Sequence, residues 1–142
     1  MRRGGRPIRG WRGALAMLAV AAAPVASVIH AQGSGRVRAL IVTGVAGDPQ
    51  LEGAFHKQAT TMIDALTTRF GVPAADIVYL AETPSRDANR IKGASTKDNV
   101  IRELTALGER SSTGDVLFVM LIGHGSGDEA ATGFNVPGPD IT

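Results

Sequence analysis

The stretch 116–122 constrains the fold of this chain more than any other segment. It holds seven consecutive apolar residues, mostly branched or aromatic, and Gly123, His124 and Gly125 follow it directly. A short run of this composition predicts a strand covered on both faces, as in a parallel sheet with helices above and below. The predicted strand stops at a histidine between two glycines, so an imidazole is expected at one edge of a sheet.

A strand and an amphipathic helix are predicted earlier in the chain. Residues 36–43 are typical of a strand, and a glycine-containing loop, residues 44–49, ends it. From about Glu52 to Phe70, apolar residues recur at intervals of three and four, and Gly71 supplies a stop signal, which indicates a helix. The apolar stripe of this helix consists of Phe55, Ala59, Met62, Ile63, Leu66 and Phe70.

A second strand and helix follow. Residues 76–80 are predicted as a strand and the polar residues 81–94 as a long loop. Residues 95–98, Ser-Thr-Lys-Asp, have the spacing of a capping box, so a helix is expected to begin there. Its apolar stripe contains Val100, Ile101, Leu104 and Leu107.

The order strand, helix, strand, helix, strand predicts an α/β fold. Alternation of this kind implies a parallel sheet with right-handed crossovers. If the three strands lie in the spatial order 2-1-3, the helices fall on opposite faces, and the loops 44–48 and 123–128 flank one crevice at the carboxyl edge. Residues 32–142 are enough for one small domain, but they are short for a complete doubly wound fold.

The first 31 residues have the organisation of a signal peptide. A basic segment precedes the apolar, alanine-rich residues 13–29, and a small-residue cleavage site precedes Gln32. The prediction is export to the periplasm or the medium, with residues 32–36 as a flexible leader and 37–142 as the domain. The alternative is an uncleaved membrane anchor, although this segment is short for a bilayer span and contains Pro24. The basic residues are Arg2, Arg3, Arg6, Arg9 and Arg12.

Removal of this leader reverses the charge of the chain. The five leader arginines leave ten basic residues against thirteen acidic ones in residues 32–142. Aromatic residues are sparse and no basic cluster is left, so neither a nucleic-acid partner nor a stable membrane span after cleavage is predicted. The chain has no cysteine, which excludes a disulfide framework and a thiolate metal site within it.

The loops at the carboxyl edge carry the candidate chemistry. His124 is the candidate imidazole, and the N–H of Gly125 is a candidate oxyanion donor because no side chain shields it. Gly47, Asp48 and Ser126 are candidates for substrate binding on the two walls of the crevice. Neither loop has the order of a dinucleotide fingerprint or a P-loop, so no nucleotide cofactor is predicted.

Metal binding has little support in the sequence. Only His56 and His124 follow the leader, and no second histidine lies at ligand spacing from either. We expect His56 to be a partly exposed helix residue. Asp128 and Glu129 are expected to be solvated loop charges, although either can orient the imidazole of His124 if it lies close to it.

The segment from Asp115 to Ser126, followed by Phe134, Asn135, Val136 and Pro137, resembles the histidine segment of legumain-like peptidases in the caspase-like superfamily. In that group a hydrophobic strand, His-Gly-Ser and an aromatic-to-proline turn recur in this order. Residues 96–100 and the glycine-containing exit from the first strand are similar too. The resemblance covers essentially all of residues 37–142. It implies a three-layer α/β/α caspase-like sandwich, of which three strands and two helices are present.

The same resemblance implies a cysteine peptidase that acts on peptide or protein substrates without a cofactor. His124 would be the catalytic imidazole, with a cysteine at the end of the next strand as nucleophile. In caspases that cysteine lies about 50 residues after the histidine, whereas this chain ends 18 residues after His124. The nucleophile is therefore expected beyond Thr142, and the 142 residues alone are expected to be inactive. The basic residue that family members carry after the first strand has no clear counterpart, because Lys57 is out of register.

Three other interpretations stay open at this stage. A noncatalytic exported binding module would keep the scaffold for protein contacts. The Gly-His-Gly-Ser segment is also similar to that of sirohydrochlorin-type chelatases, in which the histidine holds a metal, but there it lies on the first strand. Ser126 as a serine nucleophile is disfavoured because it lies outside a strand-to-helix elbow. The oligomeric state and the substrate preference are open.

Overall fold

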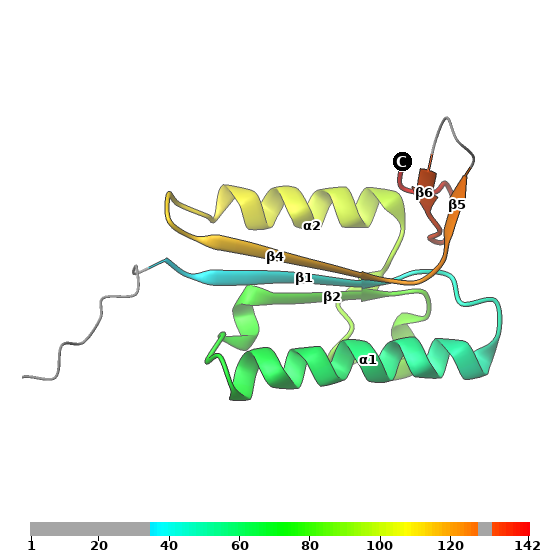
Figure 1. Ribbon diagram of the computed structural model, residues 1–142, viewed down its shortest axis with the longest axis horizontal. Helices are drawn as coiled ribbons and strands as arrows, with labels where there is room; N and C mark the ends of the chain where they lie inside the picture. Colours follow the sequence, from blue (N-terminus) through cyan, green and yellow to red (C-terminus); the bar gives the residue numbers. More distant parts are fainter. Residues whose placement is uncertain (1–34, 128–131) are drawn as a thin grey trace, which may run out of the picture. The chain divides into compact units, whose positions relative to one another are not determined.

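The computed structural model describes residues 35–127 and 132–142. Its strands and helices alternate along the chain as predicted (Figure 1). The long elements are β1 (Val37–Thr43), α1 (Pro49–Thr68), β2 (Ile77–Ala81), α2 (Lys97–Glu109) and β4 (Val116–Ile122). The short ones are β3 (Gly93–Ala94), β5 (Gly125–Gly127), β6 (Thr132–Phe134) and the 3₁₀ turns η1 (Ala74–Asp76) and η2 (Pro84–Asp87).

The predicted signal peptide and most of the predicted flexible leader lie outside the described residues. Within the described part of the chain, neither helix is long and apolar enough to cross a bilayer.

Four parallel strands form the main sheet in the order β3-β2-β1-β4. The three predicted strands are β1, β2 and β4, and their spatial order is the predicted 2-1-3. β1 pairs with β4 over its whole length, with Val37 opposite Val116 and Thr43 opposite Ile122. Because the two strands end at the same level, the loops that leave them start side by side.

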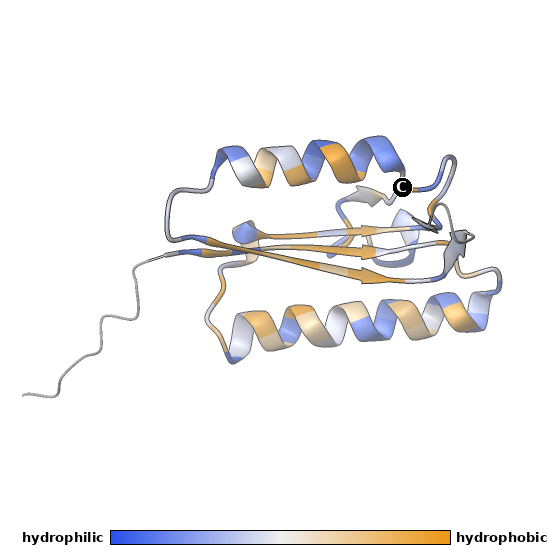
Figure 2. Cartoon of the chain, turned by 45° about the horizontal axis from the view of Figure 1, so that its top comes forward, coloured by the Kyte–Doolittle hydropathy of each residue, from blue (hydrophilic) through white to orange (hydrophobic). Residues whose placement is uncertain are grey.

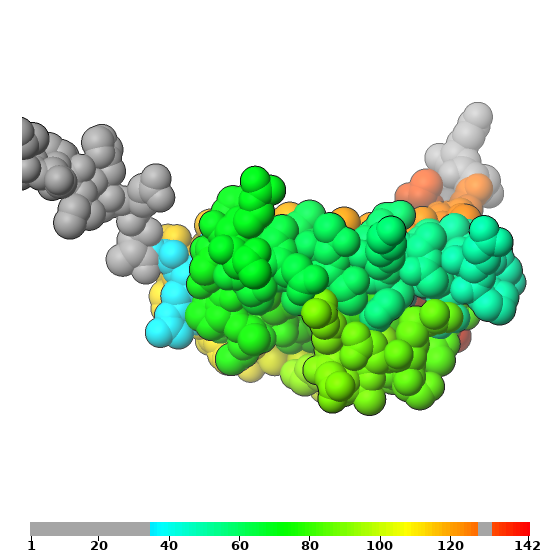
Figure 3. All heavy atoms as spheres, turned by 90° about the horizontal axis from the view of Figure 1, so that it is seen from below, coloured from blue at the N-terminus to red at the C-terminus, as the bar shows by residue number. Residues whose placement is uncertain are grey.

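One region predicted as a plain loop contains regular structure. Residues 82–94 include η2 and the short β3, which pairs with the end of β2. This segment lies along α1 (Figure 3), where Arg86 contacts Glu52 and the Arg90 Nη1 lies 2.9 Å from the Asp64 Oδ1. A two-residue strand is too short to produce a period in the sequence, so the pattern could not predict it.

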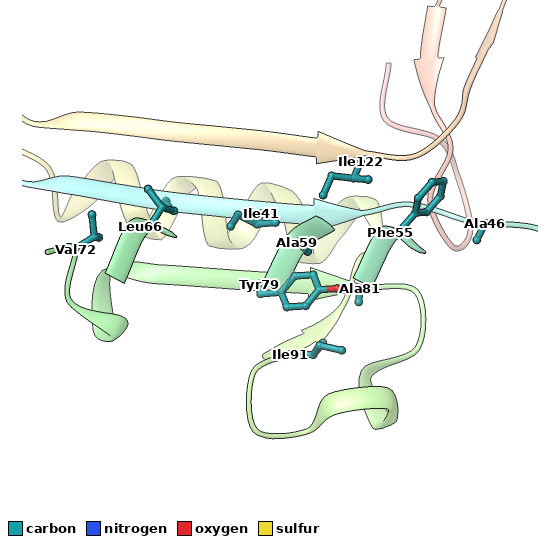
Figure 4. Packing of buried hydrophobic residues seen from close by; sticks show 11 residues of the cluster. Ile41, Ala46, Phe55, Ala59, Leu66, Val72, Tyr79, Ala81, Ile91 and Ile122 are labelled. Atoms are coloured by element: carbon teal, nitrogen blue, oxygen red, sulfur yellow. The ribbon is translucent and has the colours of Figure 1, made fainter. Parts of the chain in front are cut away.

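The two helices cover opposite faces of the sheet, with α1 on one face and α2 on the other (Figures 1 and 2). The apolar stripe of α1 faces the sheet because its residues recur with the helical period. The core on the α1 face includes Ile41, Phe55, Ala59, Leu66, Tyr79 and Ile122 (Figure 4). The core on the α2 face consists of Leu40, Val42, Val78, Leu80, Val100 and Leu107.

The prediction that residues 116–122 are covered on both faces is wrong for the described residues. β4 lies at the edge of the sheet and pairs with β1 alone, so Val116, Val119 and Leu121 are 55%, 44% and 48% exposed. On α2, Ile101 and Leu104 were predicted to be in the apolar stripe and are also exposed. By contrast, the central strand β1 has four consecutive residues that are 0% exposed, Ala39, Leu40, Ile41 and Val42.

Two helix ends also differ from the predictions. α1 ends at Thr68, so Phe70 follows the helix and is 72% exposed. α2 is capped by Thr96, whose Oγ1 accepts the Asn99 N–H, rather than by the first residue of the predicted capping box. That first residue, Ser95, is completely buried.

The amino edge of the sheet contains a buried charge cluster. The side chain of Arg38 lies between two carboxylates, with Nη1 at 2.6 Å from Asp115 Oδ2 and Nε at 3.6 Å from Asp76 Oδ1. Asp115 also accepts the backbone N–H groups of Ser112 and Arg36. These two N–H donors, together with the guanidinium of Arg38, lower the pKa of Asp115 to about 2.

Candidate active site

His124 lies at the carboxyl edge of the sheet, two residues after β4. Its side chain is exposed, and its ring meets that of Phe55 from α1 edge to face, with the ring centroids 5.7 Å apart and an interplanar angle of 62°. Phe55 itself is buried near Ala46, in the loop after β1 (Figure 4). Within residues 35–127 and 132–142 the imidazole has no hydrogen-bond partner, so both ring nitrogens can serve a proton transfer there.

Gly125 begins the hairpin of β5 and β6. It stands opposite Phe134 in the antiparallel register, and the Asn135 N–H donates to the His124 carbonyl oxygen at 2.9 Å. This bond makes Gly125 and Phe134 a non-hydrogen-bonded pair, so the Gly125 N–H is directed away from β6. The structure therefore leaves this candidate oxyanion donor outside the hairpin ladder.

The segment 134–136 lies between the two predicted walls of the crevice. Asn135 donates its N–H to His124, and its carbonyl oxygen accepts the Val45 N–H at 3.0 Å. One residue thus joins the exit of β1 to the exit of β4. The sequence indicated the aromatic-to-proline turn but not this bridge, because the two loops lie far apart along the chain.

The loop after β1 contains two of the candidate substrate-binding residues. Gly47 has a φ of +83°, a conformation that favours glycine. Asp48 caps α1, since its Oδ1 accepts the N–H groups of Gln50 and Leu51 at 2.9 and 2.8 Å. The sequence signal for this cap was Asp-Pro before a helical period, and it moves the start of α1 from the predicted Glu52 to Pro49. One carboxylate oxygen of Asp48 therefore has a structural role.

Glu82, which was not among the predicted site residues, follows β2 at the same edge. Its Oε2 accepts the Ala46 N–H at 2.9 Å and so fixes the loop after β1. The only available signal was its position directly after a predicted strand. On the other wall, the Ser126 Oγ donates to Asp140 Oδ2 at 2.8 Å, which ties β5 to the last described segment. Asp128 and Glu129 lie outside the described residues.

A family match gives the relationship of this chain to known proteins. The model of the metacaspase, peptidase C14 domain matches residues 37–136, which is more than half of the sequence. The chain belongs to the metacaspase family. No curated protein matches it significantly.

This match confirms the caspase-like resemblance and the α/β fold. Metacaspases are a caspase-like family of cysteine-type peptidases, so the family implies peptide or protein substrates. The matched range begins at β1 and ends at Val136, and therefore includes both exit loops, His124 and the bridge at Asn135.

The other histidine of the metacaspase domain, His56, contacts a different set of side chains from His124. The His56 Nδ1 is 3.2 Å from the Tyr79 hydroxyl, and its Nε2 is 3.7 Å from Asp87 Oδ2. Burial raises the pKa of Tyr79, and a hydrogen bond with Thr43 partly offsets that increase. The side chain of His56 is 22% exposed, as expected for a partly exposed helix residue.

Lys57 is also outside the loop after β1. It lies on α1 beside Met62 and Met120, where these residues line an apolar hollow of about 350 Å³. Within the described part of the domain, no group of three or more His, Cys, Asp or Glu side chains has the geometry to hold a metal ion.

Proposed function

We propose that this metacaspase domain cleaves peptide bonds with His124 as the imidazole of a histidine–cysteine dyad. The observation that carries the proposal is the position of His124. It is exposed at the carboxyl edge of a parallel sheet, beside a Gly125 N–H that the hairpin does not use. The 142 residues contain no cysteine, so the thiol has to come from outside them.

Each group then has a defined role. The imidazole of His124 takes the proton of the thiol, and the thiolate attacks the carbonyl carbon of the peptide bond. The developing oxyanion accepts the Gly125 N–H. The imidazolium returns the proton to the departing amine, and water releases the acyl group in a second step. Phe55 limits the positions of the imidazole by its edge-to-face contact.

The loop after β1 and the start of β5 are the proposed substrate-binding surface. Gly47 and Asp48 lie in the first of these segments and Ser126 in the second, and the backbone bonds of Asn135 join the exits of β1 and β4. We further propose that the domain works after export, with residues 1–31 as its cleaved signal. A mature protein whose amino terminus is Gln32 supports this; a chain that keeps residues 1–31 and stays with the membrane fraction contradicts it.

The dyad is tested with the complete product of the gene, read past the codon for Thr142. Cleavage of a fluorogenic peptide library is measured for the wild type, His124→Ala, the alanine variant of any cysteine that ends the next hydrophobic strand, and His56→Gln as the matched histidine control. We expect His124→Ala to lose about 10²- to 10⁴-fold in rate and the cysteine variant to lose at least as much, whereas the control keeps its rate. Full activity in His124→Ala refutes the assignment.

A noncatalytic binding module, which would keep the same scaffold for protein contacts, is the second candidate. A complete gene product with no nucleophile at that strand end, and no cleavage of any library peptide, favours this module. The position of His124 in the described structure does not support the chelatase interpretation. Its histidine segment belongs on the first strand, whereas His124 follows the strand that comes third among the long strands.

A further inference from the structure

The aromatic ring of Phe134 lies against the points where β1 and β4 end. A Cβ placed on Gly123 would lie 2.9 Å from Phe134 Cε2 and 3.0 Å from Cζ. A Cβ on Gly44 would lie 3.0 Å from the same Cζ. A separation of 2.9 Å is shorter than real Cβ contacts and 3.0 Å is tighter than most of them, so the ring fits closely there because both exit residues are glycines.

Backbone hydrogen bonds hold this ring in place from both sides. The next residue, Asn135, bonds to Val45 and to His124, as described above. Phe134 itself exchanges two backbone bonds with Ile141, at 2.8 and 3.0 Å. The ring also packs against the α2-face core, in the cluster that contains Leu40 and Val42. The Phe134 side chain therefore connects the α2-face core to Gly123, the residue directly before His124.

We infer that Phe134 is a positioning residue for His124 and Gly125. The inference rests on the proposed function for its catalytic meaning, but its geometry stands without it. The ring fixes the backbone at Gly123, and Asn135 fixes the His124 carbonyl group. Together they set the direction from which the imidazole meets Phe55 and the direction of the Gly125 N–H.

The two glycines permit a sharp test by paired substitutions. Neither has a positive φ, so alanine is acceptable to the backbone at both positions and only space opposes it. At Gly123 the closest obstacle is the Phe134 side chain, and a truncation of that side chain removes it. At Gly44 the closest obstacle is the Asn135 carbonyl oxygen, at 2.2 Å from the added Cβ, which no side-chain truncation removes.

The experiment uses isotope-labelled full chain and records the imidazole and backbone amide NMR signals. We expect Gly123→Ala to shift the signals of His124 and Gly125, and Phe134→Ala in the same chain to return them toward those of Phe134→Ala alone. Gly44→Ala should show no such rescue. His56 is the internal control, because its contacts are with Tyr79 and Asp87. Phe134→Leu serves if Phe134→Ala does not fold.

Three results overturn the inference. Unchanged His124 and Gly125 signals in Phe134→Ala or Phe134→Leu show that the ring does not position them. Equal shifts at His56 and His124 show a general loss of packing. Equal rescue at Gly44 and Gly123 shows that the contact with the ring is not specific. Failure of the proposed function gives a different result. If the complete gene product is inactive but the His124 signals shift in the Phe134 variants, the peptidase proposal is refuted and the positioning role of Phe134 is kept.

Discussion

The amino and carboxyl ends of the parallel strands, here called the amino edge and the carboxyl edge, differ in how their polar groups are used. At the amino edge, Arg38 is 5% exposed and its guanidinium lies between the carboxylates of Asp76 and Asp115. At the carboxyl edge, His124 is exposed, and its ring contacts a phenylalanine rather than a charged group. The amino edge has charges that are paired and buried, whereas the carboxyl edge keeps an imidazole available to solvent.

This difference separates stability from function within one small domain. Buried charges are tolerated only when partners satisfy them, so they hold the chain in one arrangement at the amino edge. A group that transfers protons has to stay accessible, and it adds little to stability. The carboxyl edge instead gains its order from backbone bonds, through Asn135, and from the ring of Phe134.

The largest stability effect is expected from Arg38→Met. The substitution keeps the apolar stem and removes the guanidinium, which leaves two carboxylates without their cation. Loss of one partner from a buried ion pair costs about 3–5 kcal/mol in the free energy of unfolding. Urea denaturation measures it, with Arg36→Met as the matched control because Arg36 is exposed. Equal losses in both variants would show that the cluster is not the source of the stability.

The acid sensitivity of the amino edge is the second expected effect. The pKa of Asp115 falls from 3.8 to about 2 on folding, so the carboxylate stabilises the fold above pH 3.8. This contribution is lost as the pH falls from 3.8 through about 2. We expect Asp115→Asn to reduce the slope of the free energy of unfolding against pH in that window. The control Glu109→Gln, at an exposed position, should keep the wild-type slope. An unchanged slope in Asp115→Asn contradicts the assignment.

The sequence predicted the long elements because each has a local pattern. Apolar runs marked β1, β2 and β4, a helical period marked α1 and α2, and the alternation of the two indicated a parallel sheet. The order 2-1-3 was only assumed for the sequence, and the structure has this order. The sequence could not predict exposure within a strand. β1 and β4 each have seven residues and are rich in apolar side chains, yet one is central and the other lies at an edge of the described sheet. The burial of a strand depends on which elements lie next to it, and its own composition does not determine these neighbours.

The candidate site shows the same limit at the level of single residues. His124 was predictable because it follows a strand, and Gly47 because its loop is glycine-rich. The contact of His124 with Phe55 depends on how α1 lies against the sheet. The bridge at Asn135 joins the exit of β4 to Val45, which lies 90 positions before Asn135 in the chain. Such contacts between distant segments leave no local pattern.

A smaller effect is expected at the carboxyl edge from Ser126→Ala. The hydroxyl donates to Asp140 at an exposed position, and such a bond contributes about 0.5–1.5 kcal/mol. A double-mutant cycle with Asp140→Ala isolates this pair in urea denaturation. A coupling energy as large as the loss from Arg38→Met would mean that the two edges stabilise the fold to the same extent. It would contradict the claim that the amino edge contributes more to stability than the carboxyl edge.

The smallest stability effect is expected from His124→Ala. The imidazole is exposed, and the contact that it loses within the described residues is the one with Phe55, so the free energy of unfolding should change by no more than about 0.5 kcal/mol. Thermal and urea denaturation of the chain provide the measurement, and Arg38→Met in the same buffers provides the contrast. A loss above about 2 kcal/mol would place His124 among the large structural effects. The carboxyl edge would then be a second stabilising edge, and the accessible imidazole could no longer be separated from the packing that surrounds it.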